Sequence, residues 1–302
     1  MSRLPLPKKS KTAQPVTWNA ADYAAHSVPQ QTWARELIAR LKLRGDERIL
    51  DVGCGDGKVT AEIARAVPRG SVTGIDASQQ MIGFAKKTFP PSEISNLKFE
   101  IMDARKIKFA PRFDFVFSNA ALHWVDDHQA FLRSAASVLK SGGRLVVSCG
   151  GKGNAQDVFL ALRSELRLKR WREFFRRMPT PYFFYAPGDY EKWLPKFGFK
   201  INTLKLAPKD ATYAGTDEFA AWLRTTWLPY TQRVPEKVAQ ASCLCVSGAK
   251  EQLTGKMPVP LPSPREEFIA AVTDRYVAKH PPDDENKIHV RMVRLEIDAV
   301  KQ

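Results

Sequence analysis

The residues best suited to chemistry in this chain form a loop with glycines at alternate positions, from Asp51 to Gly57. An apolar run precedes the loop at 48–52, and a helical pattern follows it at 58–67. Glycines at such a junction let the backbone approach a ligand closely, and the start of the following helix favours polar or charged ligand groups. The spacing therefore predicts a ligand-binding loop between a strand and a helix.

Two well-known nucleotide-binding loops have different spacings. The dinucleotide pattern requires a glycine at position 58, where this chain has Lys58. A phosphate-binding P-loop requires a Gly-Lys-Ser/Thr ending at a spacing that this loop does not have. A nicotinamide cofactor is the alternative ligand for the loop, and the position of the third glycine argues against it.

Acidic residues follow the next two predicted strands. Asp76 ends one strand, and Asp103 follows the other. A carboxylate at position 76 can accept hydrogen bonds from both hydroxyls of a ribose. Asp103 and the backbone of Ala104 could bind the amino group and a ring nitrogen of adenine. Each aspartate also has a plainer explanation, because Asp76 precedes a helix that Ser78 caps and Asp103 fits a turn. We predict the ligand-binding role for both.

The elements that must position these residues alternate between strand and helix. Strands are predicted at 48–52, 71–75, 97–102, 113–118 and 144–148, with a helix at 32–43 before them and helices at 58–67, 78–89 and 126–139 between them. Single helices between strands imply parallel βαβ units in a doubly wound α/β sheet. Ligands of such sheets bind beyond the carboxyl ends of the strands, where Asp51–Gly57, Asp76, Asp103 and Asn119 all lie.

The second half of the chain is less regular. The patterns predict a basic amphipathic helix at 157–178, helices at 217–228 and 265–278, and strands at 199–206 and 290–300 that close the sheet as an antiparallel pair. The Arg and Lys residues of the first helix are interpreted as a solvated face. The aromatic cluster at 181–185 is interpreted as core, with the wall of an apolar acceptor pocket as the alternative.

These patterns divide the chain into parts. Residues 1–15 are expected to be a disordered basic tail, and 16–150 a ligand-binding core. Residues 151–302 are expected to hold cap helices inserted after the fifth strand, followed by strands that complete the sheet. Within them, 237–263 resembles a Gly- and Pro-rich insertion that we expect to be a poorly ordered surface loop without catalytic duty.

Composition excludes several classes of protein. No apolar run approaches the ~18 residues that a membrane span needs, so we expect a soluble, cytoplasmic protein without membrane contact. The four cysteines lack the paired spacing of a structural zinc site, so we expect no metal and reduced thiols. The net charge of +15 is spread over both halves of the chain, which indicates a basic solvated surface. Nucleic-acid binding is therefore not favoured.

Three segments carry a family resemblance. Glu47–Asp56, Gly74–Ser78 and the sequence Ser-Asn-Ala-Ala-Leu-His-Trp-Val-Asp-Asp-His from Ser118 resemble the class I S-adenosylmethionine (SAM)-dependent methyltransferases. The likeness is greatest to the trans-aconitate methyltransferase family and related carboxyl methyltransferases, and Trp18–Tyr23 resembles the start of their N-terminal helix. The resemblance covers 16–150 well, is weak over 151–235 and 264–302, and is absent over 237–263. It implies a Rossmann-like seven-stranded sheet whose last strand is antiparallel.

The resemblance also implies roles for individual residues. It suggests Gly53 and Gly55 at the methionine part of SAM, Asp76 at the ribose, and Asp103 with Ala104 at the adenine. Met81 would pack near the adenine, Asp51 would approach the methionine amine, and Asn119 would lie near that amine through its backbone. Cys54 and Ala77 complete the set of expected cofactor-binding positions. The expected product of the cofactor is S-adenosylhomocysteine.

Four residues are candidates to line the acceptor site: Tyr23, His26, His123 and Trp124. Tyr23 and His26 share one face if their segment is helical, and that segment could fold over the cofactor as a lid. His123 could act as a base or bind the acceptor, while a packed loop histidine beside a core tryptophan is the alternative. Methyl transfer from SAM requires alignment of the reacting atoms and needs neither a metal nor a covalent nucleophile.

The function predicted from these features is methyl transfer to a small-molecule acceptor, most simply the oxygen of a carboxylate. A carboxylate is nucleophilic without a base, and a cation should hold it; Arg224, Arg233, Arg291 and Arg294 are available. One alternative is an RNA or protein methyltransferase that uses the basic surface, although the sequence after Asn119 lacks the Pro-Pro-aromatic pattern of enzymes that methylate base amines. The other is a non-catalytic SAM-binding protein.

Overall fold

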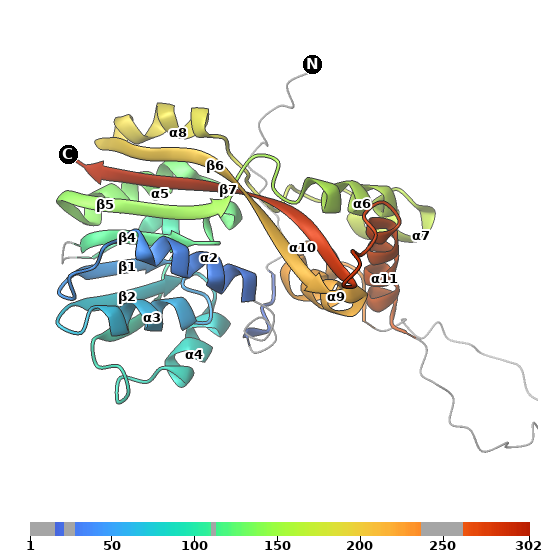
Figure 1. Ribbon diagram of the computed structural model, residues 1–302, viewed down its shortest axis with the longest axis horizontal. Helices are drawn as coiled ribbons and strands as arrows, with labels where there is room; N and C mark the ends of the chain where they lie inside the picture. Colours follow the sequence, from blue (N-terminus) through green and yellow to red (C-terminus); the bar gives the residue numbers. More distant parts are fainter. Residues whose placement is uncertain (1–15, 21–27, 110–112, 237–261) are drawn as a thin grey trace, which may run out of the picture.

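A seven-stranded sheet and a lobe of helices make up the part of the chain that the structure describes. The structure is a computed structural model, and it describes residues 16–20, 28–109, 113–236 and 262–302. In Figure 1 the sheet and its covering helices form one lobe, and α6, α7, α9, α10 and α11 form the second, called here the cap. The tail at 1–15 and most of the predicted insertion, 237–261, lie outside the described residues.

The sheet has the order β3-β2-β1-β4-β5-β7-β6. Its strands are β1 (Arg48–Val52), β2 (Ser71–Asp76), β3 (Leu97–Ile101), β4 (Phe113–Asn119), β5 (Leu139–Gly150), β6 (Phe199–Ala214) and β7 (Lys287–Lys301). Strands β1 to β5 pair in parallel, whereas β7 lies antiparallel to both β5 and β6. This arrangement confirms the mostly parallel, doubly wound sheet with an antiparallel closing strand.

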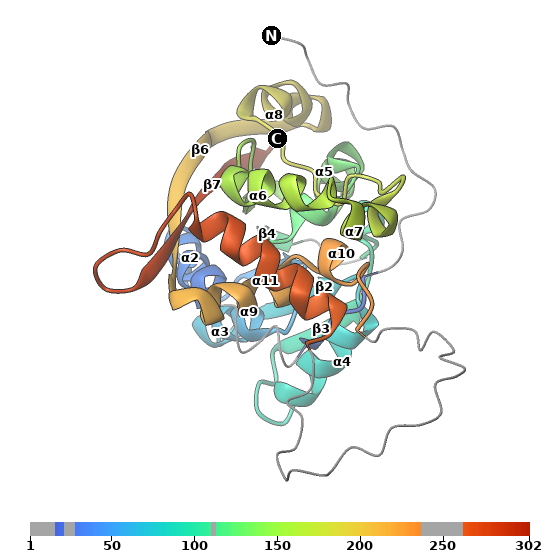
Figure 2. The same ribbon diagram turned by 90° about the vertical axis from the view of Figure 1, so that its right-hand side faces the viewer.

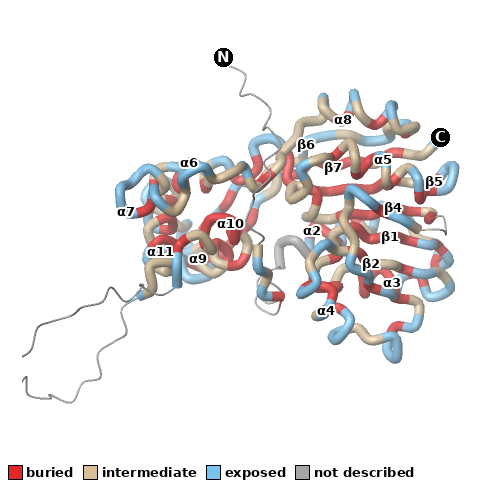
Figure 3. The backbone as a smooth tube through the Cα atoms, turned by 180° about the vertical axis from the view of Figure 1, so that it is seen from behind, coloured by how far each residue is buried: buried red, intermediate tan, exposed pale blue. Residues whose placement is uncertain are grey.

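Helices cover both faces of the sheet. The elements are α2 (Val28–Ala39), α3 (Lys58–Ala66), α4 (Gln79–Thr88), α5 (His128–Val138) and α8 (Pro187–Trp193). Buried side chains of α2, α3 and α4 form one apolar cluster with the sheet, and those of α5 and α8 form another on the opposite face. Both clusters bury alternate residues of the central strands, as a sheet covered on both sides requires. Figure 3 shows these buried stretches within the strands.

The paired strands β6 and β7 are longer than the sequence predicted, and they reach from the sheet into the cap. Strand β5 pairs with β7 only from Arg144↔Val300 to Gly150↔Arg294. Strand β6 continues along β7 as far as Ala214↔Lys287. The end of this two-stranded ribbon therefore projects beyond the edge of the sheet and carries cap helices at its tip (Figure 1).

The cap helices come from two stretches of chain. They are α6 (Gln156–Leu166) and α7 (Lys169–Arg172), which follow β5, and α9 (Gly215–Thr226), α10 (Leu228–Thr231) and α11 (Pro264–Val277), which lie between β6 and β7. In Figure 2, which faces the cap, α11 crosses the lobe near α6 and α9. Their buried faces form a third, largely aromatic core. Helix α11 starts close in space to the end of α10. Arg265 N donates a hydrogen bond to Pro235 O at 3.2 Å across this junction.

Two predicted helices were wrong in extent. The single helix predicted at 157–178 is broken after Leu166, because the chain turns there to bury Trp171 against Phe268, with ring centroids 5.3 Å apart. The helix predicted at 32–43 begins at Val28 and ends at Ala39. After Ala39 the chain makes a 3-10 turn, in which backbone N–H groups donate to carbonyls three residues earlier. Lys42 follows with a positive φ of 53°.

None of the helices in the described ranges is long and apolar enough to cross a membrane. The same ranges contain no group of three or more His, Cys, Asp or Glu side chains placed to hold a metal ion.

Glu165 fixes the break between α6 and α7. Its buried carboxylate accepts hydrogen bonds from Arg275 Nε at 2.6 Å, Trp171 Nε1 at 3.2 Å and Arg170 Nη2 at 3.1 Å. We expect Glu165→Gln to lower the free energy of unfolding by about 1–3 kcal/mol, because hydrogen bonds to a charged, buried group are lost. Urea unfolding followed by circular dichroism measures this change.

Glu173→Gln is the matched control. Glu173 also pairs with arginines, at 3.4 Å from Arg176 and 3.6 Å from Arg172, but its side chain is 59% exposed. Such surface pairs contribute little, about 0–1 kcal/mol. Equal losses in the two variants would contradict the role given to Glu165.

Candidate functional site

The glycine loop between β1 and α3 adopts a conformation that requires glycine. Gly53, Gly55 and Gly57 have φ values of 76°, 54° and 82°, in the left-handed region. A Cβ atom added to Gly53 would lie 2.1 Å from the Cβ of Ala121, in the loop after β4. A Cβ on Gly55 would meet nothing within 4 Å. The loop is therefore packed tightly at its start and open at Gly55, where a ligand can approach the backbone.

Asp76, at the carboxyl end of β2, is hydrogen bonded to this loop. Its carboxylate accepts from Gly55 N at 3.1 Å and from Ser78 N at 2.8 Å. Ser78 in turn caps α4 by accepting from Met81 N at 3.3 Å. Burial raises the pKa of Asp76. Asp76 therefore organises the start of α4 and also faces the open loop. Its position is compatible both with a structural role at the start of the helix and with ligand binding.

Asp51 lies beneath the same loop, at the end of β1. Thr60 Oγ1 donates to its carboxylate at 2.7 Å. Burial raises the pKa of Asp51 to about 7, and the negative charge of Asp76 adds to that rise. Two neighbouring carboxylates, one buried and one half-buried, stabilise a cation that lies close to both. This part of the site therefore suits a positively charged ligand.

Two further residues of the predicted cofactor set are packed rather than reactive. Cys54 is buried, and burial raises the pKa of its thiol well above the usual range, so the thiol is not a nucleophile near neutral pH. It lies against the narrow strand position of Gly74, where a Cβ atom would lie 3.0 Å from the Cβ of Cys54. Met81 is buried in the first turn of α4. Ala77 is exposed between Asp76 and Ser78.

Asp103 is held by an arginine that sequence reasoning did not single out. Arg105 donates to its carboxylate from Nε at 3.0 Å and from Nη2 at 2.6 Å, and also bonds Asp126 at 2.6 Å. The Arg105 guanidinium holds the pKa of Asp103 below its usual value. Asp103 also caps the short 3-10 helix that begins at Ala104. Asp103 therefore has the turn role that the sequence offered as its plainer explanation. Its carboxylate also lies at the same edge of the sheet as Asp76, because β2 and β3 pair in parallel.

A buried arginine in the middle of β7 is bonded to β4 and β5 near their carboxyl ends. Arg294, on β7, donates from Nη2 to Asn119 Oδ1 at 3.1 Å and to Ser148 O at 2.6 Å. It also donates from Nε to Ser148 Oγ at 3.2 Å. Its guanidinium lies 5.4 Å from the ring centroid of Trp33, and the residue is only 3% exposed. A positive charge therefore lies next to Asn119, at the carboxyl edge of the sheet.

The other three candidate arginines lie elsewhere. Arg224 forms an ion pair with Glu266, and Arg291 lies 3.4 Å from Asp157. Arg233 donates to Phe174 O at 3.4 Å. The sequence offered no means of choosing among the four, because only the antiparallel pairing of β7 brings Arg294 to the strand ends.

His123 lies beside Arg294 in the loop after β4. Its Nδ1 accepts a hydrogen bond from Gly150 N at 3.3 Å, and Gly150 pairs with Arg294 across β5 and β7. Burial, together with the charges of Arg294 and His128, lowers the pKa of His123 to about 3. The imidazole is therefore neutral at physiological pH, with the proton assigned to Nε2 by the bond at Nδ1.

His128 fixes the same loop in place, although sequence reasoning assigned it no role. Its Nε2 lies 2.7 Å from Leu122 O, and its Nδ1 is hydrogen bonded to the Tyr190 hydroxyl of α8. The loop between β4 and α5 is thereby attached to a helix far away in the sequence.

Aromatic side chains line the cap side of this loop. Trp124 contacts Trp18, at a ring-centroid distance of 5.2 Å, and Tyr182, at 4.8 Å. Tyr182 stacks on Phe184 at 5.7 Å. The cluster predicted at 181–185 is therefore packed against Trp124 and His123. The other two predicted lining residues, Tyr23 and His26, lie outside the described residues.

Comparisons with known proteins agree with this architecture. A family described as "Methyltransferase domain" matches residues 49–143. An uncharacterized methyltransferase of Schizosaccharomyces pombe is 33% identical over 191 residues, covering 61% of this chain and 71% of that protein. A trans-aconitate 2-methyltransferase of Agrobacterium fabrum is 28% identical over 301 residues, covering 95% of this chain and all of its own.

A solved structure shares the fold. The YcgJ protein of Bacillus subtilis superposes with a TM-score of 0.55, at 16% identity, over 89% of this chain and 97% of its own.

The residues at the glycine loop fit SAM. This cofactor carries positive charges on its sulfur and on its amine, and Asp51 and Asp76 place buried carboxylates at the loop. The open space at Gly55 leaves room for a ligand against the backbone.

Asp76→Asn tests the ribose assignment. The amide keeps the shape of the side chain but removes the charge that accepts hydrogen bonds from hydroxyl groups, each of which contributes about 1.5–3 kcal/mol. We expect the affinity for SAM in calorimetry to fall by about ten- to a hundredfold. Glu100→Gln, on the exposed edge strand β3, is the control and should bind SAM normally. Unchanged affinity in Asp76→Asn would remove the assignment.

The pKa of Asp51 predicts a pH dependence of cofactor binding. Below about pH 7 the carboxyl is protonated and neutral, and above it a negative charge is present that would attract a cationic group of the cofactor. SAM affinity should therefore rise, by up to about tenfold, between about pH 6 and about pH 8. Binding at the acidic end should also release protons, which calorimetry in buffers of different ionisation enthalpy detects. Asp51→Asn should flatten the profile; the same slope in that variant would assign the titration to another group.

Proposed function

This chain belongs to the SAM-dependent methyltransferases, and we propose that its acceptor is the carboxylate of a small organic acid, which it converts to a methyl ester. The related A. fabrum protein is named for a carboxylic acid substrate, trans-aconitate. The single observation that carries the proposal in this chain is Arg294, a buried guanidinium beside Asn119 at the carboxyl edge of the sheet.

Arg294 supplies what a carboxylate acceptor needs. A guanidinium carries a permanent positive charge and five N–H donors. Three of the donors of Arg294 are given to Ser148 and Asn119, so Arg294 attracts an acceptor carboxylate through its charge. The hydrogen bonds that Arg294 donates at the strand ends fix its orientation, and Trp33 covers one face of the guanidinium. In a site removed from water, such a preorganised charge binds an anion more strongly than an exposed arginine would.

His123 favours the same class of acceptor. Its Nδ1 already accepts from Gly150 N, and its pKa of about 3 makes it a poor proton acceptor. A phenol or an ammonium group would need a base before it could attack a methyl group. A carboxylate is already ionised near neutral pH. The role that fits His123 is donation of a hydrogen bond from Nε2 to the acceptor.

The reaction then needs only positioning. SAM supplies a methyl group made electrophilic by the sulfonium that carries it. An oxygen of the acceptor carboxylate forms a bond to the methyl carbon as the carbon–sulfur bond breaks, giving the ester and S-adenosylhomocysteine. No proton moves, and the positive and negative charges disappear together.

Each part of the chain has a place in this proposal. Asp76 binds the ribose hydroxyls, Asp51 faces the methionine amine, and Asp103 with Ala104 holds the adenine. Residues 16–150 thereby bind the cofactor, and 151–302 supply Arg294 and the aromatic wall of Tyr182 and Phe184. That wall limits the access of water, which strengthens the charge interactions at the acceptor.

A panel of carboxylic acids tests the proposed function. The full chain is incubated with each acid, and in separate reactions with RNA or with protein, in the presence of SAM that carries a labelled methyl group. The products are then treated with alkali. Methyl esters release their label as methanol under alkali, whereas N-methyl and C-methyl products retain it. Labelled, alkali-stable RNA or protein with no ester from any acid would overturn the proposal in favour of a macromolecular acceptor.

Arg294→Gln should lower kcat/KM for the acid by about ten- to a hundredfold, mainly through KM, because the buried positive charge that attracts the carboxylate is lost. Steady-state kinetics on the best acid of the panel gives the value, and calorimetry should show that SAM affinity is kept. Arg294→Lys retains the positive charge but not the planar guanidinium, and its kcat/KM should lie between those of Arg294→Gln and the unaltered chain. Arg291→Gln alters an exposed arginine of the same strand and should behave as the unaltered chain does. An unchanged KM in a folded Arg294→Gln would remove Arg294 from the acceptor site.

A further inference from the structure

The segment that forms α6 and α7 concentrates the positive charge of the chain. Residues 160–177 contain seven Lys and Arg residues and two Glu residues, so these 18 residues carry +5 of the chain's net charge of +15. In Figure 1 α6 and α7 form the upper edge of the cap, and Figure 3 shows most of α7 as exposed. The exposed residues of 160–177 are called here the cationic face.

The two glutamates of this segment neutralise little of the charge. Glu165 is buried, and its carboxylate is shared between Arg170 and Arg275, which lies outside the segment. Glu173 pairs with two neighbouring arginines. Four cations are exposed and form no ion pair with an acid among the described residues: Arg163, Arg167, Lys169 and Arg177.

Aliphatic side chains are exposed among these cations. Leu160 is 47% exposed and Leu168 37%, and they are two of the four large hydrophobic side chains that are exposed in the described ranges. Leu160 shares the outer side of α6 with Arg163 and Arg167 at helical spacing, and Leu168 lies between Arg167 and Lys169 in the sequence. Cations interspersed with exposed leucines are typical of helices that lie in the interface of a membrane.

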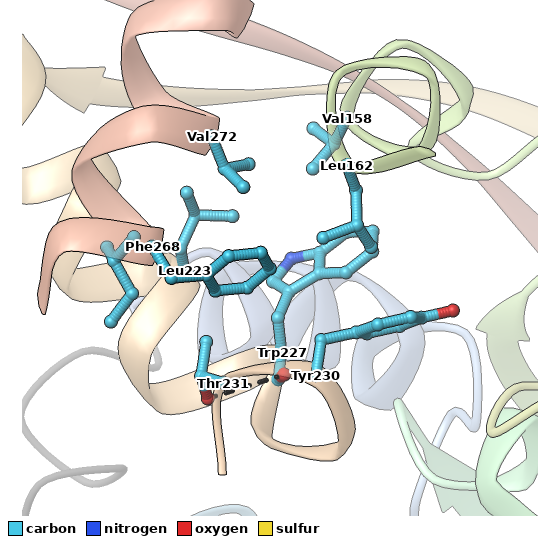
Figure 4. Close-up of a pocket in the computed structure, with 9 residues that line it drawn as sticks. Val158, Leu162, Leu223, Trp227, Tyr230, Thr231, Phe268 and Val272 are labelled. Carbon is cyan, nitrogen blue, oxygen red and sulfur yellow. Dashed lines mark hydrogen bonds between the residues drawn. The ribbon is translucent and has the colours of Figure 1, made fainter. Parts of the chain in front are cut away.

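The inner side of α6 is already occupied by the core of the cap. Figure 4 shows Val158 and Leu162 directed toward Trp227, Phe268 and Val272. The space left among the lining side chains is about 10 Å³, which holds at most one water molecule. Helix α6 therefore offers a partner only its outer side, where the cations and Leu160 lie.

The aromatic rings of the segment favour a lipid surface over a nucleic acid. Trp171 and Phe175 both turn inward and contact Phe268, with ring centroids 5.3 Å and 5.4 Å apart. Single-stranded nucleic acids bind to exposed rings on which their bases stack, and the described part of the cationic face has no exposed ring. The surface of a bilayer requires only cations for its acidic headgroups and aliphatic side chains for its acyl chains.

We propose that the cationic face binds the surface of a bilayer that contains negatively charged phospholipids. The four unpaired cations lie at the headgroups, and Leu160 and Leu168 enter the boundary between the headgroups and the acyl chains. This contact is peripheral and needs no membrane span, whereas the expectation of no membrane contact came from the length of the apolar runs alone. The inference does not depend on which acceptor the enzyme methylates.

Sedimentation of the full chain with vesicles tests the proposal. Vesicles that contain phosphatidylcholine and phosphatidylserine are compared with vesicles of phosphatidylcholine alone. We expect the affinity for the mixed vesicles to be at least about tenfold higher, because several cations meet the negative surface. Raising the salt concentration from ~0.1 M to ~1 M should release most of the bound chain, since the Debye length falls from about 10 Å to about 3 Å.

Arg167→Gln combined with Lys169→Gln removes two unpaired cations beside Leu168. This variant should bind the mixed vesicles about ten- to thirtyfold more weakly, because each cation near such a surface contributes about fivefold. Lys86→Gln combined with Lys87→Gln is the matched control. It removes the same charge from two exposed, adjacent residues of α4 in the other lobe, and it should bind as the unaltered chain does.

Leu160→Gln tests the aliphatic part of the contact. Because roughly half of this side chain remains to be buried, its loss should weaken binding to the mixed vesicles by about three- to tenfold. Ile101→Gln, which alters a 54% exposed side chain of β3, is the control and should keep the affinity. All the altered residues are exposed, and circular dichroism verifies that each variant is folded.

The outcomes decide between the occupants of this face. Equal affinity for the two kinds of vesicle, or an equal loss in the Lys86 and Lys87 variant, would overturn the proposal. A loss on removal of the charges without a loss in Leu160→Gln would reduce the contact to general electrostatic attraction and would also overturn it. If the chain ignores vesicles but binds a single-stranded RNA probe, and the Arg167 and Lys169 variant loses that binding, the face serves a nucleic acid instead.

Discussion

The antiparallel pairing of β7 with β5 determines where the two lobes meet. The parallel strands place the glycine loop, Asp76 and Asn119 at one edge of the sheet, and β7 enters that edge from the opposite direction. Its first residues project past the edge with β6 and carry the cap helices there (Figure 1). Arg294 occupies the position at which the ribbon leaves β5. The antiparallel direction of β7 thus places both the cap and the buried guanidinium of Arg294 at this edge of the sheet.

The site that results has separated charges. Asp51 and Asp76 form a negative region under the glycine loop, and Arg294 forms a positive region on β7, which is separated from β4 by β5. The loop after β4 lies between them, since Ala121 packs against Gly53 and His123 is bonded to Gly150. A cationic donor and an anionic acceptor would each meet the opposite charge and be directed toward this loop. Because both regions are buried, solvent screens them only weakly.

The sequence predicted the part of the site that depends on local pattern. Glycine spacing and the polar residue at each strand end predicted that the loop, Asp76 and Asn119 lie at one edge of the sheet, because parallel strands bring their carboxyl ends together. Arg294 could not be separated from Arg224, Arg233 and Arg291, since its position depends on pairing between strands 144 residues or more apart in the register. The break in the helix predicted at 157–178 was missed for a similar reason. The break allows Trp171 to pack against Phe268 of α11, which is a contact between segments far apart in the sequence.

The point where the chain leaves and re-enters the cap has a practical meaning. Arg265 N donates to Pro235 O, and Arg265 Nε donates to Val234 O at 3.0 Å, so the two ends of the intervening stretch are fastened to each other. The anchoring of Arg265 to Val234 and Pro235 therefore keeps the start of α11 beside the end of α10. Because these two bonds hold the ends of the stretch together, this junction is the place in the cap where a fluorescent reporter or an affinity handle is best inserted.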